Sequence, residues 1–251
     1  MDNAPVRELR RLADSARFHF GERGVRGVAD EVADIGRAYV TYPFARRARS
    51  GRTLAIGGRE IPYMLHHYNR AWRNERTVEL TLAKSYLDET SPGTTLEIGN
   101  VLSHYWPVSH DILDKYEHSP GVLNDDIVDF RPASPYDRVV SISTLEHVGW
   151  DERPREPDKT LRAYRNIRTL VRDGGSILLT CPLGQNPHLD EYLHDGAIDF
   201  PVQRFLRRVS ADNRWEECAG DEVRGARYGA PYRNANAIFV GVVPGDDNWG
   251  A

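Results

Sequence analysis

The sequence lacks several features that define common protein classes. Its two cysteines, Cys181 and Cys218, lie far apart without metal-ligand spacing, so neither a disulfide framework nor a cysteine zinc site is predicted. No segment approaches the roughly eighteen consecutive apolar residues of a membrane span. The 33 basic and 37 acidic residues give a net charge of -4, which provides no electrostatic reason to expect nucleic acid or an anionic membrane as partner. We therefore predict a cytoplasmic protein with a small-molecule partner, and its oligomeric state stays open.

What the sequence does contain is enough apolar material for one main domain, with 251 residues of which 40% are hydrophobic. Residues 1–90 are expected to form an N-terminal cap: helical spacing over 5–38, a hairpin turning at Gly57-Gly58, and helical spacing again from Trp72. No low-complexity linker separates this cap from residues 91–251, so both belong to the same predicted domain.

From residue 94 onward, short apolar runs alternate with longer segments. The runs are rich in Val, Ile and Leu and alternate little, which is typical of strands covered on both faces of a parallel sheet: "TTLEIGN", "HDILDKY", "GVLNDDI", "YDRVVSIS" and "GSILLTCP". A crossover helix is predicted in "DKTLRAYRNIRTLVRDGG", and "VQRFLRRVS" and "ANAIFVGVVP" supply a sixth and a seventh strand. The pattern predicts a doubly wound α/β fold, in which ligands bind beyond the carboxyl ends of the strands.

The ordered motifs "LEIGN", "ILDKY", "NDDIVDF", "YDRVVSISTLEHVGW" and "LVRDGGSILLTCPLG" together resemble the class I S-adenosylmethionine-dependent methyltransferases. The resemblance covers most of residues 94 to 183 and the two terminal strands. It implies a Rossmann-like, doubly wound sheet of seven strands, mostly parallel with the last strand antiparallel, behind an N-terminal helical cap. One departure is clear: Asn100, Val101, Leu102 and Ser103 replace the glycines that usually follow Gly99.

By this resemblance, the cofactor S-adenosylmethionine would contact residues at the tips of successive strands. Glu97 and Gly99 would lie beside its methionine portion, Asp114 would bind the ribose, and Asp126 with Ile127 would flank the adenine. Asn100 and Ser143 complete the expected cofactor-binding set. Each of the carboxylates can instead be a solvated strand end or a helix cap, and that reading stays open.

A general base is expected at His147 of "TLEHVGW", because imidazole titrates near neutral pH and this residue follows the fourth strand at the mouth of the pocket. A structural histidine at a helix start is the alternative. A divalent metal held by Glu146, His147 and His188 is a weaker possibility and is not favoured, because Ser143 stands where one expected carboxylate would be.

Residues of the cap and of the strand-end loops are expected to contact the acceptor: Tyr68, Trp72, His104 and His188. The predicted function is methyl transfer to a small molecule, most plausibly to an oxygen of a sugar or another hydroxylated metabolite. The alternatives are a noncatalytic S-adenosylmethionine-binding module and, with less support, a nicotinamide-dependent oxidoreductase, which would require a G-x-G-x-x-G loop that "GNVLSHY" does not provide.

Overall fold

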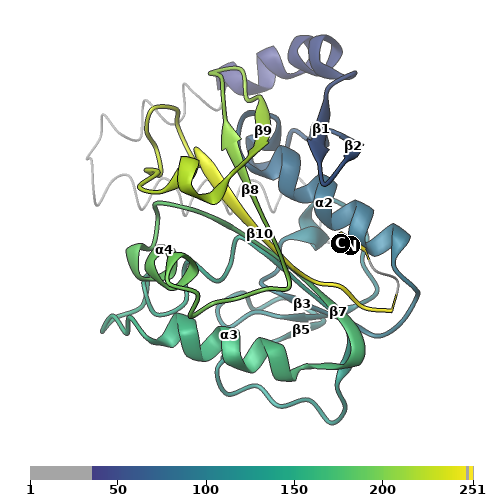
Figure 1. The fold of residues 1–251 in the computed structure, drawn as a ribbon. Coiled ribbons are helices and arrows are strands. Elements are labelled where there is room, and N and C mark those ends of the chain that lie inside the picture. Colours follow the sequence, from purple (N-terminus) through teal and green to yellow (C-terminus); the bar gives the residue numbers. More distant parts are fainter. Residues whose placement is uncertain (1–35, 247–248, 251) are drawn as a thin grey trace.

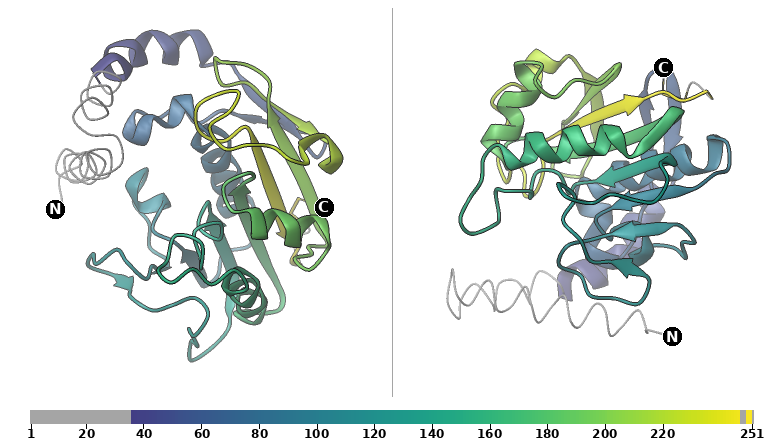
Figure 2. Two further views of the ribbon diagram at one scale, coloured as in Figure 1. Left: turned by 90° about the vertical axis from the view of Figure 1, so that its left-hand side faces the viewer. Right: turned by 90° about the horizontal axis from the view of Figure 1, so that it is seen from below.

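The computed structural model describes residues 36–246 and 249–250 (Figure 1). The two helices expected between residues 5 and 38 therefore lie almost entirely outside the described residues. A helix over residues 36–49 opens the described part. Figure 2 shows this helix (purple) at the edge of the molecule, near the C-terminal loops drawn in yellow-green.

The N-terminal hairpin forms as predicted. Strands β1 (Thr53–Ile56) and β2 (Arg59–Pro62) pair antiparallel, and the two residues that join them have φ angles of 59° at Gly57 and 73° at Gly58. Two positive φ angles in succession require a two-residue turn of the kind that glycine pairs favour.

The helical spacing that starts at Trp72 corresponds to two elements. Trp72 lies in the short helix η1 (Tyr68–Arg73), whereas the long helix α2 (Arg76–Glu89) begins four residues later. The break comes at Asn74, whose backbone is extended and whose side-chain oxygen accepts a hydrogen bond from the backbone N–H of Arg76. An asparagine that bonds to its own backbone two residues on favours a helix start over helix continuation.

The main sheet confirms the predicted doubly wound fold. Its strand order is β5-β4-β3-β6-β7-β10-β8-β9, in which β3, β4, β5, β6 and β7 run parallel and β10 runs antiparallel to both of its neighbours. The bounds are β3 (Thr95–Ile98), β4 (Asp111–Leu113), β5 (Val122–Leu123), β6 (Tyr136–Ile142), β7 (Val171–Pro182), β8 (Val202–Arg208), β9 (Trp215–Cys218) and β10 (Ala237–Val243).

Within residues 36–246 and 249–250 the sheet has eight strands, one more than the seven that were expected. The additional strand β9 pairs only with β8, antiparallel, at the edge of the sheet. Its sequence, "WEEC", has no apolar alternation, because only Trp215 is buried while Glu216 and Glu217 are exposed. Charged side chains are common on edge strands, where they discourage pairing with another chain.

Helices cover both faces of the sheet, as the predicted fold requires. Helices α3 (Lys159–Thr169) and α4 (Pro187–His194) share one apolar core with the sheet, and α2 and the hairpin share the other (Figure 1). Neighbouring sheet residues point to opposite cores: Val139 faces the first and Val140 the second. The cap thus shares its core with the sheet. No helix in the described part of the chain is long and apolar enough to cross a membrane.

Candidate active site

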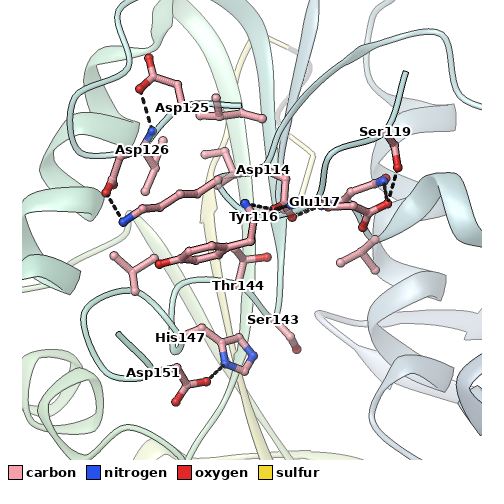
Figure 3. Close-up of a pocket in the computed structure, with 18 of the residues that line it drawn as sticks. Asp114, Tyr116, Glu117, Ser119, Asp125, Asp126, Ser143, Thr144, His147 and Asp151 are labelled. Carbon is pink, nitrogen blue, oxygen red and sulfur yellow. Dashed lines mark hydrogen bonds and ion pairs between the residues drawn. The ribbon is translucent and has the colours of Figure 1, made fainter. Parts of the chain in front are cut away.

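A cavity of about 820 Å³ opens at the carboxyl ends of β3, β4 and β6, where the strand order reverses (Figure 3). This is the position at which doubly wound sheets bind ligands. We call it the strand-end cavity. Most of the predicted cofactor residues line it: Gly99, Asn100, Asp114, Asp126, Ile127 and Ser143.

The loop after β3 depends on a glycine at its first position. Gly99 has a φ angle of 83°, and a Cβ atom there would lie 2.2 Å from Oγ1 of Thr144. Its N–H donates to the carbonyl of Leu113, 2.8 Å away, which ties the loop to the neighbouring strand. Only glycine fits this combination of backbone angle and close approach.

Glu97 holds the rest of this loop from beneath. The side chain is fully buried and does not line the cavity. Its Oε1 accepts hydrogen bonds from the backbone N–H groups of Val101 and Leu102 at 2.8 and 2.7 Å, and its Oε2 lies 2.7 Å from Nε2 of His110. The carboxylate therefore fixes a turn in which the usual later glycines are missing. Its predicted contact with the cofactor stays a prediction.

Asp114 joins the ends of the first two parallel strands. Its Oδ2 accepts from the N–H of Asn100 at 3.1 Å, and its Oδ1 accepts from the N–H groups of Tyr116 and Glu117, both at 2.8 Å (Figure 3). A carboxylate has about four acceptor positions, so room for a ligand hydroxyl remains. Asp114 thus lines the cavity, and its predicted contact with a ribose stays a prediction.

Asp126 is engaged in an ion-pair network. Its Oδ2 lies 2.8 Å from Nζ of Lys115 and 2.7 Å from Nζ of Lys159. Desolvation would raise the pKa of Asp126, but hydrogen bonds from the two lysines lower it to about 2. The neighbouring carboxylate of Asp125, which sequence reasoning missed, is exposed and also lines the cavity.

Tyr116 is a second cavity residue that sequence reasoning missed. Its side chain is 66% exposed although it belongs to the lining of the cavity. In the view of Figure 3 the ring extends from the end of β4 into the space between Asp126 and His147. The ammonium of Lys115 lies over the ring, 5.2 Å from its centroid, so the face away from this ammonium is the one suited to stack on a planar base. The signal was present in the sequence, since an aromatic residue closely follows the acidic strand tip in "ILDKY".

His147 lines the cavity from the loop after β6, as predicted, and lies between two carboxylates. Its Nδ1 is 2.6 Å from Oδ2 of Asp151, and its Nε2 is 3.5 Å from Oε1 of Glu146. Desolvation alone would lower the pKa of His147, but the hydrogen bond to Asp151 and the Glu146 charge raise it. Asp151, four residues along the chain, was not expected and orients the imidazole.

Glu146 is 1% exposed, and neither of its carboxylate oxygens has a hydrogen-bond partner among the described residues. Burial raises its pKa to about 7, although the neighbouring imidazole of His147 acts in the opposite direction. A second buried carboxylate, Glu79, accepts hydrogen bonds from the hydroxyls of Ser143 and Thr180 at 2.6 and 2.8 Å. Ser143, one of the expected cofactor-binding residues, thus lines the cavity while its hydroxyl donates a hydrogen bond to Glu79.

Two of the four predicted acceptor-binding residues meet in the strand-end cavity. The rings of Tyr68 and His104 stack with centroids 5.2 Å apart, and both line the cavity. Nδ1 of His104 is buried and has no hydrogen-bond partner among the described residues.

The other two predicted acceptor-binding residues lie outside this cavity. Trp72 is buried beneath the guanidinium groups of Arg49 and Arg73. His188 packs edge-on against Trp150, with ring centroids 5.8 Å apart. Within the described residues, no group of three or more His, Cys, Asp or Glu side chains is arranged to hold a metal ion, so Glu146, His147 and His188 do not form one.

No protein-family model matches the sequence, and no curated protein sequence matches it. Solved structures similar to it include N-methyltransferase NodS from Bradyrhizobium japonicum WM9 in complex with S-adenosyl-L-homocysteine, with 12% identity, a TM-score of 0.44, and coverage of 68% of this chain and 87% of that chain. A possible histamine N-methyltransferase from Thermotoga maritima has 13% identity, a TM-score of 0.42, and coverage of 70% and 94%. An S-adenosylmethionine-dependent methyltransferase from Clostridium acetobutylicum ATCC 824 has 9% identity, a TM-score of 0.35, and coverage of 65% and 89%. The order and directions of the strands confirm the expected doubly wound, mostly parallel sheet, apart from the additional edge strand β9.

Proposed function

We propose that this chain is an S-adenosylmethionine-dependent methyltransferase that acts on a small molecule. The observation that carries the proposal is the strand-end cavity, in which Gly99, Asp114 and Tyr116 offer a close backbone approach, a hydroxyl acceptor and an aromatic face side by side. These are the groups that an adenosyl compound needs for its amino-acid portion, its ribose and its base.

The bound cofactor would supply an electrophilic methyl group, and the protein has to align the acceptor, exclude water and remove a proton. Tyr68 and His104 would close the cavity from the side of the cap, since their stacked rings contribute to its wall. His147 would accept the proton, and its hydrogen bond to Asp151 would hold the imidazole in one orientation.

The acceptor atom that this arrangement favours is a hydroxyl oxygen of a sugar or another hydroxylated metabolite. A hydroxyl loses its proton during transfer, and a histidine with a pKa above its usual value is a suitable partner at mildly alkaline pH. The polar lining of the cavity, which includes Asp114, Glu117 and Asp151, supports an acceptor with several hydroxyl groups.

Calorimetric titration of the full chain with S-adenosylmethionine and with NAD tests the cofactor. We expect saturable binding of the first and none of the second. Incubation with labelled S-adenosylmethionine and a metabolite pool then tests turnover, with S-adenosylhomocysteine as the product to be measured. Binding without turnover on any acceptor would support the noncatalytic module instead, and absence of binding would refute the proposal.

A further inference from the structure

A second cavity, of about 730 Å³, lies between the helix at residues 36–49, the segment 69–75 and the loops that flank β9 and precede β10. Its lining is strongly basic. Among the described residues, two carboxylates line it, Glu75 and Asp212, together with six arginines: Arg37, Arg49, Arg70, Arg73, Arg208 and Arg233. We call this cavity the arginine pocket.

Two of these arginines lack a carboxylate partner among the described residues. Arg49 donates to the backbone carbonyl of Trp72 at 3.0 Å. Arg208 donates to the carbonyls of Ser210, Arg233 and Ala211 at 3.1, 2.8 and 3.1 Å. The pocket's own Asp212 is engaged with Arg52 and Ser210. Desolvation lowers the pKa of both Arg49 and Arg208, and nearby guanidinium groups lower it further, whereas Asp212 raises the pKa of Arg49 and Glu75 raises that of Arg208.

Aromatic rings hold these guanidinium groups in place. Arg49 and Arg73 lie over the ring of Trp72, 5.0 and 5.5 Å from its centroid, and Arg208 lies 5.0 Å from the ring centroid of Tyr232. Side chains fixed in this way lose less conformational freedom when they bind a ligand. Trp72 therefore supports the arginine pocket and does not contact the strand-end cavity.

The two cavities are lined by successive residues of one short segment. Tyr68 lines the strand-end cavity, whereas the residues that follow it, from Asn69 to Glu75, line the arginine pocket, except for Ala71.

We propose that the arginine pocket binds a phosphoryl or diphosphoryl group, carried by the methyl acceptor while its reactive hydroxyl reaches the strand-end cavity. The link to the acceptor rests on the proposed methyltransferase function, whereas the anion site itself does not. Guanidinium groups bind phosphate oxygens through paired, charge-assisted hydrogen bonds. Several guanidinium groups in one pocket can all bind the many oxygens of a diphosphate, whereas a ligand with a single carboxylate offers only two oxygens.

Titration of the full chain with inorganic pyrophosphate at low salt tests the site directly. We expect saturable binding that weakens as salt is added. The double variant Arg49→Gln/Arg208→Gln should bind pyrophosphate at least about tenfold more weakly. The control Arg165→Gln, at an exposed position of α3 outside both cavities, should bind it like the wild type. Equal affinity of all three proteins, or no binding by the wild type, would overturn the proposal.

Because Arg208 also bonds to three loop carbonyls, a second variant guards against simple misfolding. Arg37→Gln alters an exposed helix residue that lines the pocket, and it should weaken pyrophosphate binding by a smaller factor while the circular dichroism spectrum stays unchanged. If the double variant misfolds and Arg37→Gln still binds pyrophosphate as tightly as the wild type, the proposal is refuted.

Two further ligands separate the sources of the anion. Tighter binding of a nucleoside diphosphate than of pyrophosphate supports a phosphorylated acceptor, whereas tighter binding of a short single-stranded RNA would replace the small-molecule acceptor by a nucleic acid and refute the proposal. The affinity for S-adenosylmethionine is measured in parallel on each variant. If the wild type does not bind S-adenosylmethionine, the methyltransferase function is refuted, whereas the result for pyrophosphate still stands.

Discussion

The strand-end cavity and the arginine pocket balance their charges in different ways. Carboxylates of the strand-end cavity are held by backbone N–H groups or lysines, as in Asp114 and Asp126. In the arginine pocket, Arg49 and Arg208 are held by backbone carbonyls and aromatic rings, which fix their positions without neutralising them. The first cavity is an ordered extension of the sheet, whereas the second contains two guanidinium groups that have no carboxylate partner among the described residues.

Replacing His147 gives the largest expected effect and should act on the strand-end cavity alone. His147→Ala should slow turnover on the order of 100-fold or more, because a positioned general base is removed, with little change in S-adenosylmethionine affinity. In the wild type, activity should rise with pH through a midpoint above 6.5, since the deprotonated imidazole is the base and its pKa is raised. Initial rates across pH measure both effects.

Asp151→Asn provides the control for that profile. Removing the charge that raises the pKa of His147 should move the alkaline rise to lower pH. A profile that stays in place would exclude His147 as the titrating group, and so would a fully active His147→Ala variant.

Asp114→Ala should weaken S-adenosylmethionine binding by about 10- to 100-fold, because a charged acceptor is lost together with three hydrogen bonds that shape the loop. Pyrophosphate affinity should be unchanged, since Asp114 lies in the other cavity. Calorimetry with both ligands tests the separation, with the exposed Asp173→Ala variant as control. Parallel loss of both affinities would mean that the cavities are not independent.

Gly99→Ala tests whether the loop that lines the strand-end cavity requires a glycine, with Gly196→Ala as the control. Gly99 and Gly196 both have positive φ angles, 83° and 73°, but only at Gly99 would a Cβ atom meet another side chain, at 2.2 Å. Gly196→Ala should cost roughly 1–2 kcal/mol of unfolding free energy for its backbone angle. Gly99→Ala should cost about 1–3 kcal/mol more because of the clash with Thr144. Urea denaturation measures the difference, and similar costs would show that Thr144 gives way.

Glu146→Gln has the smallest expected effect, on the pH dependence of stability. Folding raises the pKa of Glu146 from 4.5 to about 7. A raised pKa contributes stability that is complete below the unfolded value and lost as the pH rises through the folded value. The wild type should therefore lose roughly 1–3 kcal/mol relative to Glu146→Gln between pH 4.5 and 7. Denaturation at several pH values tests this, and the exposed Glu191→Gln should follow the wild type.

The sequence predicted those parts of the molecule whose residues are neighbours along the chain. Apolar runs identified the parallel strands, Gly57-Gly58 identified the hairpin turn, and the tips of β3 and β4 identified Gly99 and Asp114. Strand β9 was missed because a four-residue edge strand with one buried side chain has no periodic signal.

The arginine pocket could not be predicted, because its members come from positions as distant as Arg37 and Arg233 and only the folded chain brings them together. The basic segment "ARRARSGR", residues 45–52, contributes Arg49 alone to the pocket. Trp72 was expected at the acceptor for a similar reason: aromatic residues before the sheet can face either cavity, and spacing along the helix does not distinguish them.

The buried carboxylate beneath the first loop has a consequence for recognising other proteins of this kind. Glu97, with His110 thirteen residues later, does here what repeated glycines are expected to do. A sequence pattern built on alternating glycines would pass over chains that anchor this turn by an acid and a distant imidazole. A pattern of Glu-x-Gly-Asn with a histidine thirteen residues after the glutamate describes the anchor found in this chain.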